Sequence, residues 1–211
     1  MNSRQKEELA NVLSHAIGIG LAVAGAALLI TFGAIYGDAW HVVSFSVFGA
    51  CLVILYTAST VFHSARNARL RYALNKLDHS SIFILIAGSY TPIALVTLRG
   101  AFGWVIFGLI WAFAIAGVIF KLFYYTHQMR KLSTWLYICM GWLIIIAIVP
   151  LIKNTPAISL WFFLAGVLSY SGGAFFYIKR RVPYFHFIFH LFVLGGSICH
   201  FFGFLYLLPL N

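Results

Sequence analysis

The stretch that decides the fold is residues 182–204, VPYFHFIFHLFVLGGSICHFFGF, near the end of the chain. It is long and apolar enough to cross a bilayer as a helix, yet it contains three histidines. His186 and His190 are four residues apart, a spacing that places both imidazoles on one face of a helix. Because an ionisable residue inside a membrane span is costly, it is a candidate functional residue by default. Two rings on one face can hold one metal ion if other helices supply further ligands, but two inert, hydrogen-bonded histidines would also fit the pattern.

The composition of the chain indicates an integral membrane protein. Of its 211 residues, 63% are hydrophobic and only 9% are charged, whereas a soluble domain is about half apolar and a quarter charged. The apolar runs are long and continuous, which favours helices over the alternating strands of an outer-membrane barrel. At roughly 20 residues per span, the chain has room for about seven helices. We therefore expect one all-α domain over residues 1–211, a seven-transmembrane helix bundle.

The apolar runs place the seven spans, because short polar breaks with glycine, proline or basic residues separate them. The expected spans are residues 15–37, 41–63, 78–98, 102–123, 134–152, 158–178 and 184–208. Residues 2–13 are polar and could form a short interfacial helix before the first span. The first apolar run is longer than the apolar core of a signal peptide, so we expect it to be retained as a span.

The distribution of charge predicts the orientation in the membrane. The net charge is +10, but the basic residues lie in the short breaks between apolar runs, so they indicate membrane topology and not nucleic-acid binding. Twelve of the fourteen Lys and Arg residues lie before the first span or in the second, fourth and sixth breaks, if Lys121, at the end of the fourth span, is counted with the fourth break. Only Arg99 and Lys153 lie on the other side. Since Lys and Arg stay in the cytoplasm, the N-terminus is expected inside and the C-terminus outside.

Four polar residues from three spans are expected to meet at the cytoplasmic side. His63 closes the second span, Asp78 opens the third, and His186 and His190 open the seventh. The short connection between the second and third spans is expected to place His63 and Asp78 at the same height. Three imidazoles and a carboxylate match a zinc ligand set, although iron, copper or nickel also accept these ligands. Asp78 alone would also fit a carboxylate that is favoured at a helix start by the helix dipole.

Ser59 precedes His63 by four residues, so its hydroxyl and the imidazole share a helix face. His200 lies ten residues beyond His190, about 15 Å along a helix, which is too far to bind the same ion. The remaining histidines are interpreted as interfacial or packing residues: His15, His41, His79 and His127.

At these positions the chain resembles the hemolysin III proteins of bacteria, the prokaryotic branch of the progestin and adipoQ receptor family. The resemblance covers nearly the whole chain, and its motifs are Glu8-x-x-Asn11-x-x-x-His15, Ser59-x-x-x-His63, Lys76-Leu77-Asp78 with Gly88-Ser89-Tyr90-Thr91-Pro92, and His186-x-x-x-His190. It implies a seven-helix bundle with a cytoplasmic N-terminus in the bacterial inner membrane. It also implies zinc held by the three histidines, with Asp78 contacting the ion directly or through a water, and Ser59 nearby.

The family is similar to the alkaline ceramidases, so the resemblance implies hydrolysis of a lipid amide. We expect the substrate to be a lipid amide or ester that enters sideways from the membrane, and a role in membrane homeostasis fits this expectation. Three histidines leave a fourth position for water, the pattern of catalytic zinc. Asp78 would then be the general base, and Ser59 would hydrogen-bond the oxyanion or the water. Two alternatives stay open. One is a membrane sensor or transducer in which a structural zinc clamps the helices, and the other is a cytolysin, which the family name suggests.

Overall fold

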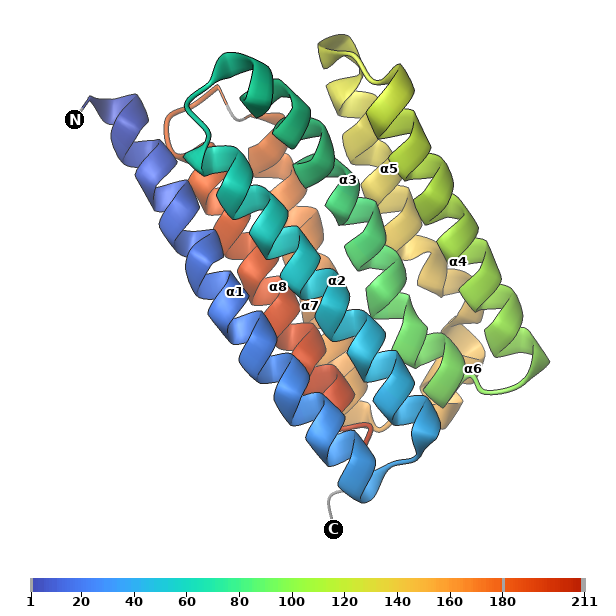
Figure 1. Cartoon of the computed structure of the whole chain (residues 1–211). Helices are drawn as coiled ribbons and strands as arrows, with labels where there is room; N and C mark the ends of the chain where they lie inside the picture. The colour runs from blue at the N-terminus through green and yellow to red at the C-terminus, as the bar shows by residue number, and fades with distance from the viewer. Residues whose placement is uncertain (1, 180, 210–211) are drawn as a thin grey trace.

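The computed structural model describes residues 2–179 and 181–209, with only the backbone of His127 described. It is a bundle of helices (Figure 1). The α-helices are α1 (Ser3–Tyr36), α2 (Ala39–Ser64), α3 (Ala68–Pro92), α4 (Ala101–Ile119), α5 (Arg130–Trp142), α6 (Ile148–Asn154), α7 (Ala157–Ile178) and α8 (Phe185–Leu205). Wider or tighter turns extend or join them at Ile93–Thr97, Phe120–Tyr124, His127–Met129 and Leu143–Ala147.

Within the described ranges, seven helical segments are long and apolar enough to cross a membrane. A π-helical turn at Ile93–Thr97 extends α3, and another at Phe120–Tyr124 extends α4. A tighter 3-10 stretch at Leu143–Ala147 joins α5 and α6 into one span. The described residues form no strand. The predicted all-α, seven-span architecture is confirmed.

Two helices begin well before the apolar runs that predicted them. α1 is continuous from Ser3, because Asn2 and Gln5 form a reciprocal capping box at its start, and no separate interfacial helix precedes the span. α3 begins at Ala68 and not near residue 78, because the Asn67 side chain caps two free backbone amides of its first turn. The connection after α2 is therefore short, and Asp78 lies well inside α3.

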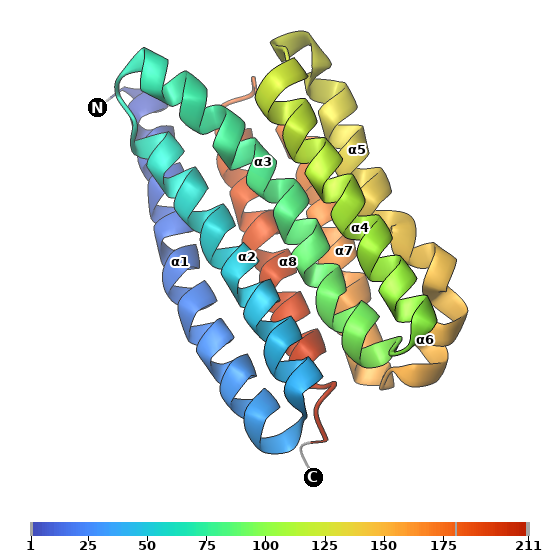
Figure 2. The ribbon, with the colours of Figure 1, turned by 45° about the vertical axis from the view of Figure 1, so that its right-hand side comes forward.

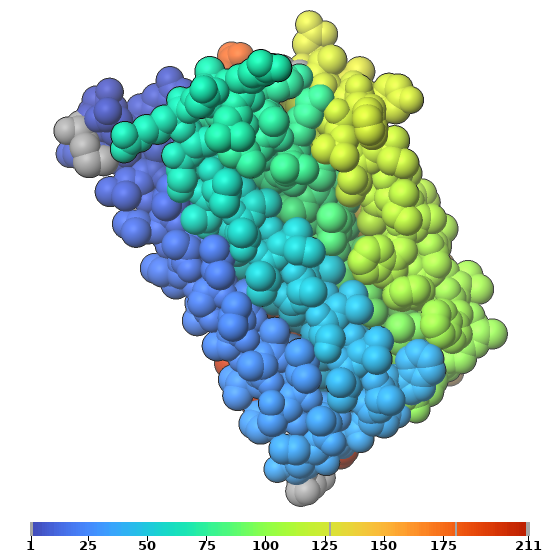
Figure 3. All heavy atoms as spheres, in the orientation of Figure 1, coloured from blue at the N-terminus to red at the C-terminus, as the bar shows by residue number. Residues whose placement is uncertain are grey.

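The spans α1 to α4 each pack against the next in the chain, α5 packs against both α4 and α7, and α8 packs against both α7 and α1 (Figure 2). α1, α2, α3 and α4 lie side by side on the face seen in Figure 3. α3 is the most central span, since 72% of its most apolar stretch is buried, the largest share of the seven. α1 approaches α2 closely at Gly18, where a Cβ would lie 2.5 Å from the Tyr56 ring.

The bundle has two ends that differ in chemistry. The start of α1, the α2–α3 connection and the start of α8 lie at one end, called here the histidine end (Figure 1). The α1–α2 and α3–α4 turns lie at the other, called here the far end. The side of the membrane on which each end lies stays a prediction from the charge distribution.

Candidate metal centre

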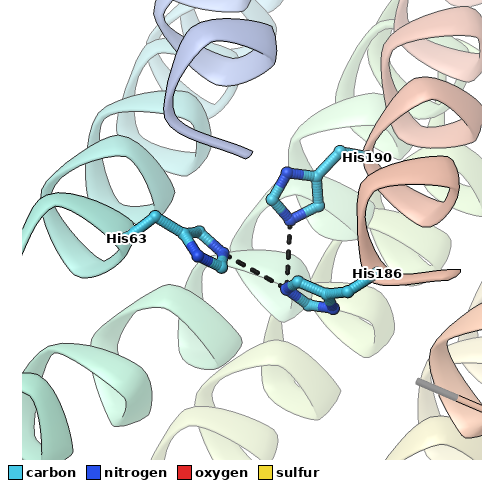
Figure 4. Close-up of side chains that lie close together, drawn as sticks. All are labelled: His63, His186 and His190. Atoms are coloured by element: carbon cyan, nitrogen blue, oxygen red, sulfur yellow. Dashed lines mark hydrogen bonds between the residues drawn. The ribbon is translucent and has the colours of Figure 1, made fainter. Parts of the chain in front are cut away.

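Three imidazoles meet at the histidine end, one from the last turn of α2 and two from the first turns of α8 (Figure 4). The Nε2 atom of His186 lies 3.2 Å from Nε2 of His63 and 3.2 Å from Nε2 of His190. Ligand nitrogens of all three rings lie within 4.8 Å of one another. His63 and His190 are buried and His186 is half-buried. The structure thus brings together the three histidines that the sequence singled out.

The positions of the three ring nitrogens are explained better by a shared metal ion than by hydrogen bonds among the rings. Nδ1 of His63 lies 2.7 Å from the Glu8 carboxylate, so this nitrogen carries the proton and Nε2 presents a lone pair. A neutral His186 can carry one proton on Nε2, which can serve only one of its two close neighbours. Two nitrogens bound to one tetrahedral zinc ion lie roughly 3.3 Å apart. The two separations from His186, both 3.2 Å, match that value. The separation between His63 and His190 is at most 4.8 Å, so the three residues could hold one metal ion.

Glu8 on α1 orients the first of these ligands. One of its oxygens accepts from Nδ1 of His63, and the other forms an ion pair with Arg71 of α3. Arg71 also donates to the Ala65 carbonyl at 3.3 Å. A carboxylate on the remote nitrogen of a ligating histidine fixes its tautomer and raises its basicity. The Glu8 side chain therefore holds His63 in the tautomer whose Nε2 atom can bind a metal ion.

α1 also covers His190. The Ser14 hydroxyl lies 3.4 Å from Nδ1 of His190 and donates to the Asn11 carbonyl at 3.0 Å. The ring of His15 packs on that of His190 with 3.8 Å between centroids, which agrees with the interpretation of His15 as a packing residue. Glu8 and Ser14 are not among the residues that the sequence predicts for the centre. The spacings of three and four show only that Glu8, Asn11 and His15 share one helix face, and not which partners that face contacts.

Asp78 and Ser59 lie beside the three histidines and not among them. Asp78 is buried, interacts electrostatically with His63, and lies next to the Ser59 hydroxyl one turn below that histidine. Its carboxylate is not one of the ligand atoms within 4.8 Å of one another. The structure therefore groups three of the four expected metal ligands and places the fourth as their neighbour. Direct ligation by Asp78 stays a prediction.

A buried cation accompanies this carboxylate. Lys121, counted from the sequence as a loop residue, is fully buried because the π-helical turn that extends α4 carries it into the bundle. Its Nζ lies 3.4 Å from the Tyr125 ring centroid and 5.8 Å from that of Tyr137, and it interacts electrostatically with Asp78. Aromatic faces and a carboxylate offset the cost of burying an ammonium group. The histidine end thus contains a second buried polar group next to the three imidazoles.

Apolar cavities run from this region along the middle of the bundle. A cavity of about 110 Å³ lies between α3, α5, α7 and α8, and one of about 440 Å³ continues beyond it. Both share the side chains of Tyr90, Trp142 and His200. Tyr177 lines the first cavity and packs its ring 6.1 Å from that of His186. The Tyr177 ring therefore separates the first apolar cavity from His186.

Seven membrane-spanning helices with three buried histidines at one end define a multi-pass membrane protein with a candidate metal centre. A family model described as Haemolysin-III related matches residues 3–201, and the chain belongs to that family. Hemolysin-3 of Bacillus cereus is 45% identical over 97% of this chain and 93% of its own length. The Hemolysin-3 homolog of Bacillus subtilis (strain 168) is 42% identical over 93% of this chain and 92% of its own.

A more distant relative comes from animals. The monocyte to macrophage differentiation factor of Homo sapiens is 28% identical over 93% of this chain and 82% of its own length. No solved structure matches the chain. The resemblance inferred from the motifs is confirmed at the level of the family.

Proposed function

We propose that the protein is a zinc-dependent intramembrane hydrolase that acts on a lipid amide or ester. The observation that carries the proposal is the convergence of three Nε2 atoms, with a buried carboxylate beside them. His63, His186 and His190 would hold the ion, and Glu8 and Ser14 would support two of these rings. The orientation predicted from charge would place this centre at the cytoplasmic side of a bacterial inner membrane.

Bound zinc would lower the pKa of a coordinated water to about 7, which supplies a nucleophile near neutral pH. Asp78 would accept the proton of that water and return it to the leaving nitrogen or oxygen, because it is a buried carboxylate near His63 and, unlike Glu8, does not bind the Nδ1 atom of that ring. Ser59 would orient Asp78 or donate a hydrogen bond to the developing oxyanion. Lys121, which is fully buried, would balance the charge of Asp78.

The apolar cavities support a lipid substrate. A chain of methylene groups matches their walls, which consist almost entirely of aliphatic and aromatic side chains. A lipid could lie along α3, α5 and α7 with its scissile bond near Tyr177, the ring between the cavity and His186. Membrane lipids would then be both the surroundings and the substrate source.

The test is release of fatty acid from a ceramide and from a matched ester by zinc-loaded protein in mixed micelles. We expect Asp78→Asn to lower kcat by about 10²–10⁴-fold, the range of a general base, with zinc content and helicity unchanged. Asp38→Asn, a carboxylate at the far end, serves as the matched control and should keep full turnover. Full turnover by Asp78→Asn would refute the mechanism, and no hydrolysis of either substrate by folded, zinc-loaded wild type would refute the function.

A structural zinc in a membrane sensor or transducer is the second candidate, and one observation favours it. The centre and its supporting carboxylate join α1, α2 and α8, so a bound ion would clamp three helices. That candidate predicts a lower Tm after zinc removal with no hydrolysis under any condition. A cytolysin, as the names of the bacterial relatives suggest, predicts leakage of dye from liposomes by purified protein, which the hydrolase does not.

A further inference from the structure

A third cavity opens at the histidine end and differs from the other two. It has a volume of about 490 Å³, and His63 and His186 form part of its wall. Its charged lining consists of four arginines and two glutamates: Arg4, Arg71, Arg130, Arg181, Glu7 and Glu8. We call this space the arginine vestibule. The vestibule has a charged wall, whereas no charged residue among those described lines the two cavities in the middle of the bundle.

The charges of the vestibule do not cancel among themselves. Arg71 pairs with Glu8, and one further glutamate faces three further arginines, so the lining has a net charge of +2. Arg130 is half-buried, and its Nε is shielded from solvent and has no hydrogen-bond partner among the described residues. An unpartnered donor at this depth costs free energy unless a ligand accepts from it. The net positive charge of the lining and the unpartnered Nε of Arg130 therefore favour the binding of an anion in the vestibule.

Helix geometry adds to the positive potential. α1, α5 and α8 all start at this end, and their first turns, which are fully described, contain no acidic residue. Helix N-termini carry partial positive charge, so Arg4 and Arg130 sit where a cation is normally disfavoured. Two cations at helix starts become favourable when an anion lies between them. Residues from distant parts of the chain thus produce one concave, positive site.

We propose that the arginine vestibule binds a phosphate group, either the headgroup of an anionic phospholipid or a free phosphate. The guanidinium fork matches the geometry of phosphate oxygens, and the net charge of +2 matches a phosphate monoester. Basic pockets between membrane helices at the level of the headgroups are a common form of lipid recognition. The proposal concerns binding alone and stands whether or not the three histidines support hydrolysis.

The test is calorimetric titration of the whole protein, in a maltoside detergent, with dioctanoyl phosphatidic acid and with inorganic phosphate. We expect saturable binding that Arg130→Gln and Arg181→Gln each weaken about fivefold, the effect of about 1 kcal/mol per basic residue. Arg69→Gln is the matched control, because Arg69 is an exposed arginine at the same end and does not line the vestibule. Dioctanoylglycerol, which lacks the phosphate, should not bind there.

Each outcome decides the proposal. Binding of the lipid without competition by inorganic phosphate identifies a headgroup site, and full competition identifies a phosphate site. An equal loss in the Arg69→Gln control, or no loss in either vestibule variant, overturns the proposal. Metal chelation tests whether the arginines or a metal ion on the histidines bind the phosphate. Phosphate binding that is retained after chelation supports the proposal, and phosphate binding that is lost with the metal overturns it. Should Arg130→Gln fail to fold, Arg181→Gln carries the test, because Arg181 is exposed before α8.

Discussion

The same three chemical groups meet at both ends of the bundle. At the far end, the Asp38 carboxylate lies 2.8 Å from Nδ1 of His41 and pairs with Arg99. At the histidine end, the Glu8 carboxylate lies 2.7 Å from Nδ1 of His63 and pairs with Arg71. Each carboxylate thus binds one imidazole and one guanidinium, and the two groups can be compared directly.

The two groups differ in sequence separation and burial. Asp38 and His41 are three residues apart and form the cap of α2, with side chains of Asp38 and Arg99 43% and 50% exposed. Glu8 is 55 residues from His63, and the His63 side chain is only 2% exposed. A local pair can form wherever a helix starts, whereas the distant pair requires α1 and α2 to be packed. A carboxylate–histidine pair therefore indicates function when distant segments build it and the other ring nitrogen faces further ligands.

Removal of the imidazole should produce the largest difference between the two ends. We expect His63→Ala to reduce bound zinc from about one ion per chain to nearly none, because two histidines from one helix remain. His41→Ala should keep its zinc, since His41 faces only the α2 cap. Plasma mass spectrometry of detergent-purified protein measures both variants after identical purification. Zinc retained by His63→Ala, or lost equally by His41→Ala, would contradict the assignment of the centre.

Removal of the carboxylate charge should give an intermediate effect. We expect Glu8→Gln to weaken zinc binding about 10–100-fold, the usual effect of a lost outer-shell carboxylate. Asp38→Asn should leave the zinc affinity unchanged, and it should cost little stability because asparagine is also a good N-cap. Competition with a fluorescent chelator measures both affinities. Equal affinities in Glu8→Gln and wild type would show that Glu8 serves only the ion pair with Arg71.

The ligand pair on α8 could be predicted from sequence because helix geometry alone places His186 and His190 on one face. His63 could be added because the charge distribution put the end of α2 and the start of α8 on one side. The role of Glu8 could not be assigned in this way. It depends on the contact between α1 and α2, which no local pattern encodes.

The deviations at α3 and α4 have equally specific causes. The start of α3 depends on a single side-chain cap at Asn67, so hydropathy alone placed it too late. Burial of Lys121 depends on a π-helical turn, and a lysine in a polar break otherwise indicates a loop. The distance between Asp78 and the imidazoles depends on how the helices tilt and which rotamers the side chains adopt. Spacing within one helix could therefore be predicted from the sequence, whereas the distance between Asp78 and the imidazoles could not.

At the far end, a change of pH should alter the contribution of the Asp38 cap to the Tm without affecting metal binding. Partial desolvation raises the pKa of Asp38, but hydrogen bonds and charge from Arg99 and His41 outweigh it and hold that pKa below its usual range. A depressed folded-state pKa stabilises the protein above the unfolded value of about 3.9, and the contribution is lost as the pH falls toward the folded value. We expect the Tm of wild type to exceed that of Asp38→Asn near neutral pH, and we expect this gap to narrow as the pH falls below the unfolded value of about 3.9.

This effect should be the smallest of the three, because exposed ion pairs contribute at most about 1 kcal/mol. Thermal unfolding of both proteins in detergent measures it, and added salt should shrink the gap at neutral pH by screening the charges. Zinc content should stay equal in the two proteins wherever both are folded, since neither Asp38 nor Arg99 contacts the centre. A gap of constant size from neutral pH to well below about pH 3.9 would mean that the shape of the cap, and not its charge, stabilises the far end. The two ends would then differ in metal binding and not in how the charge of their carboxylates affects stability.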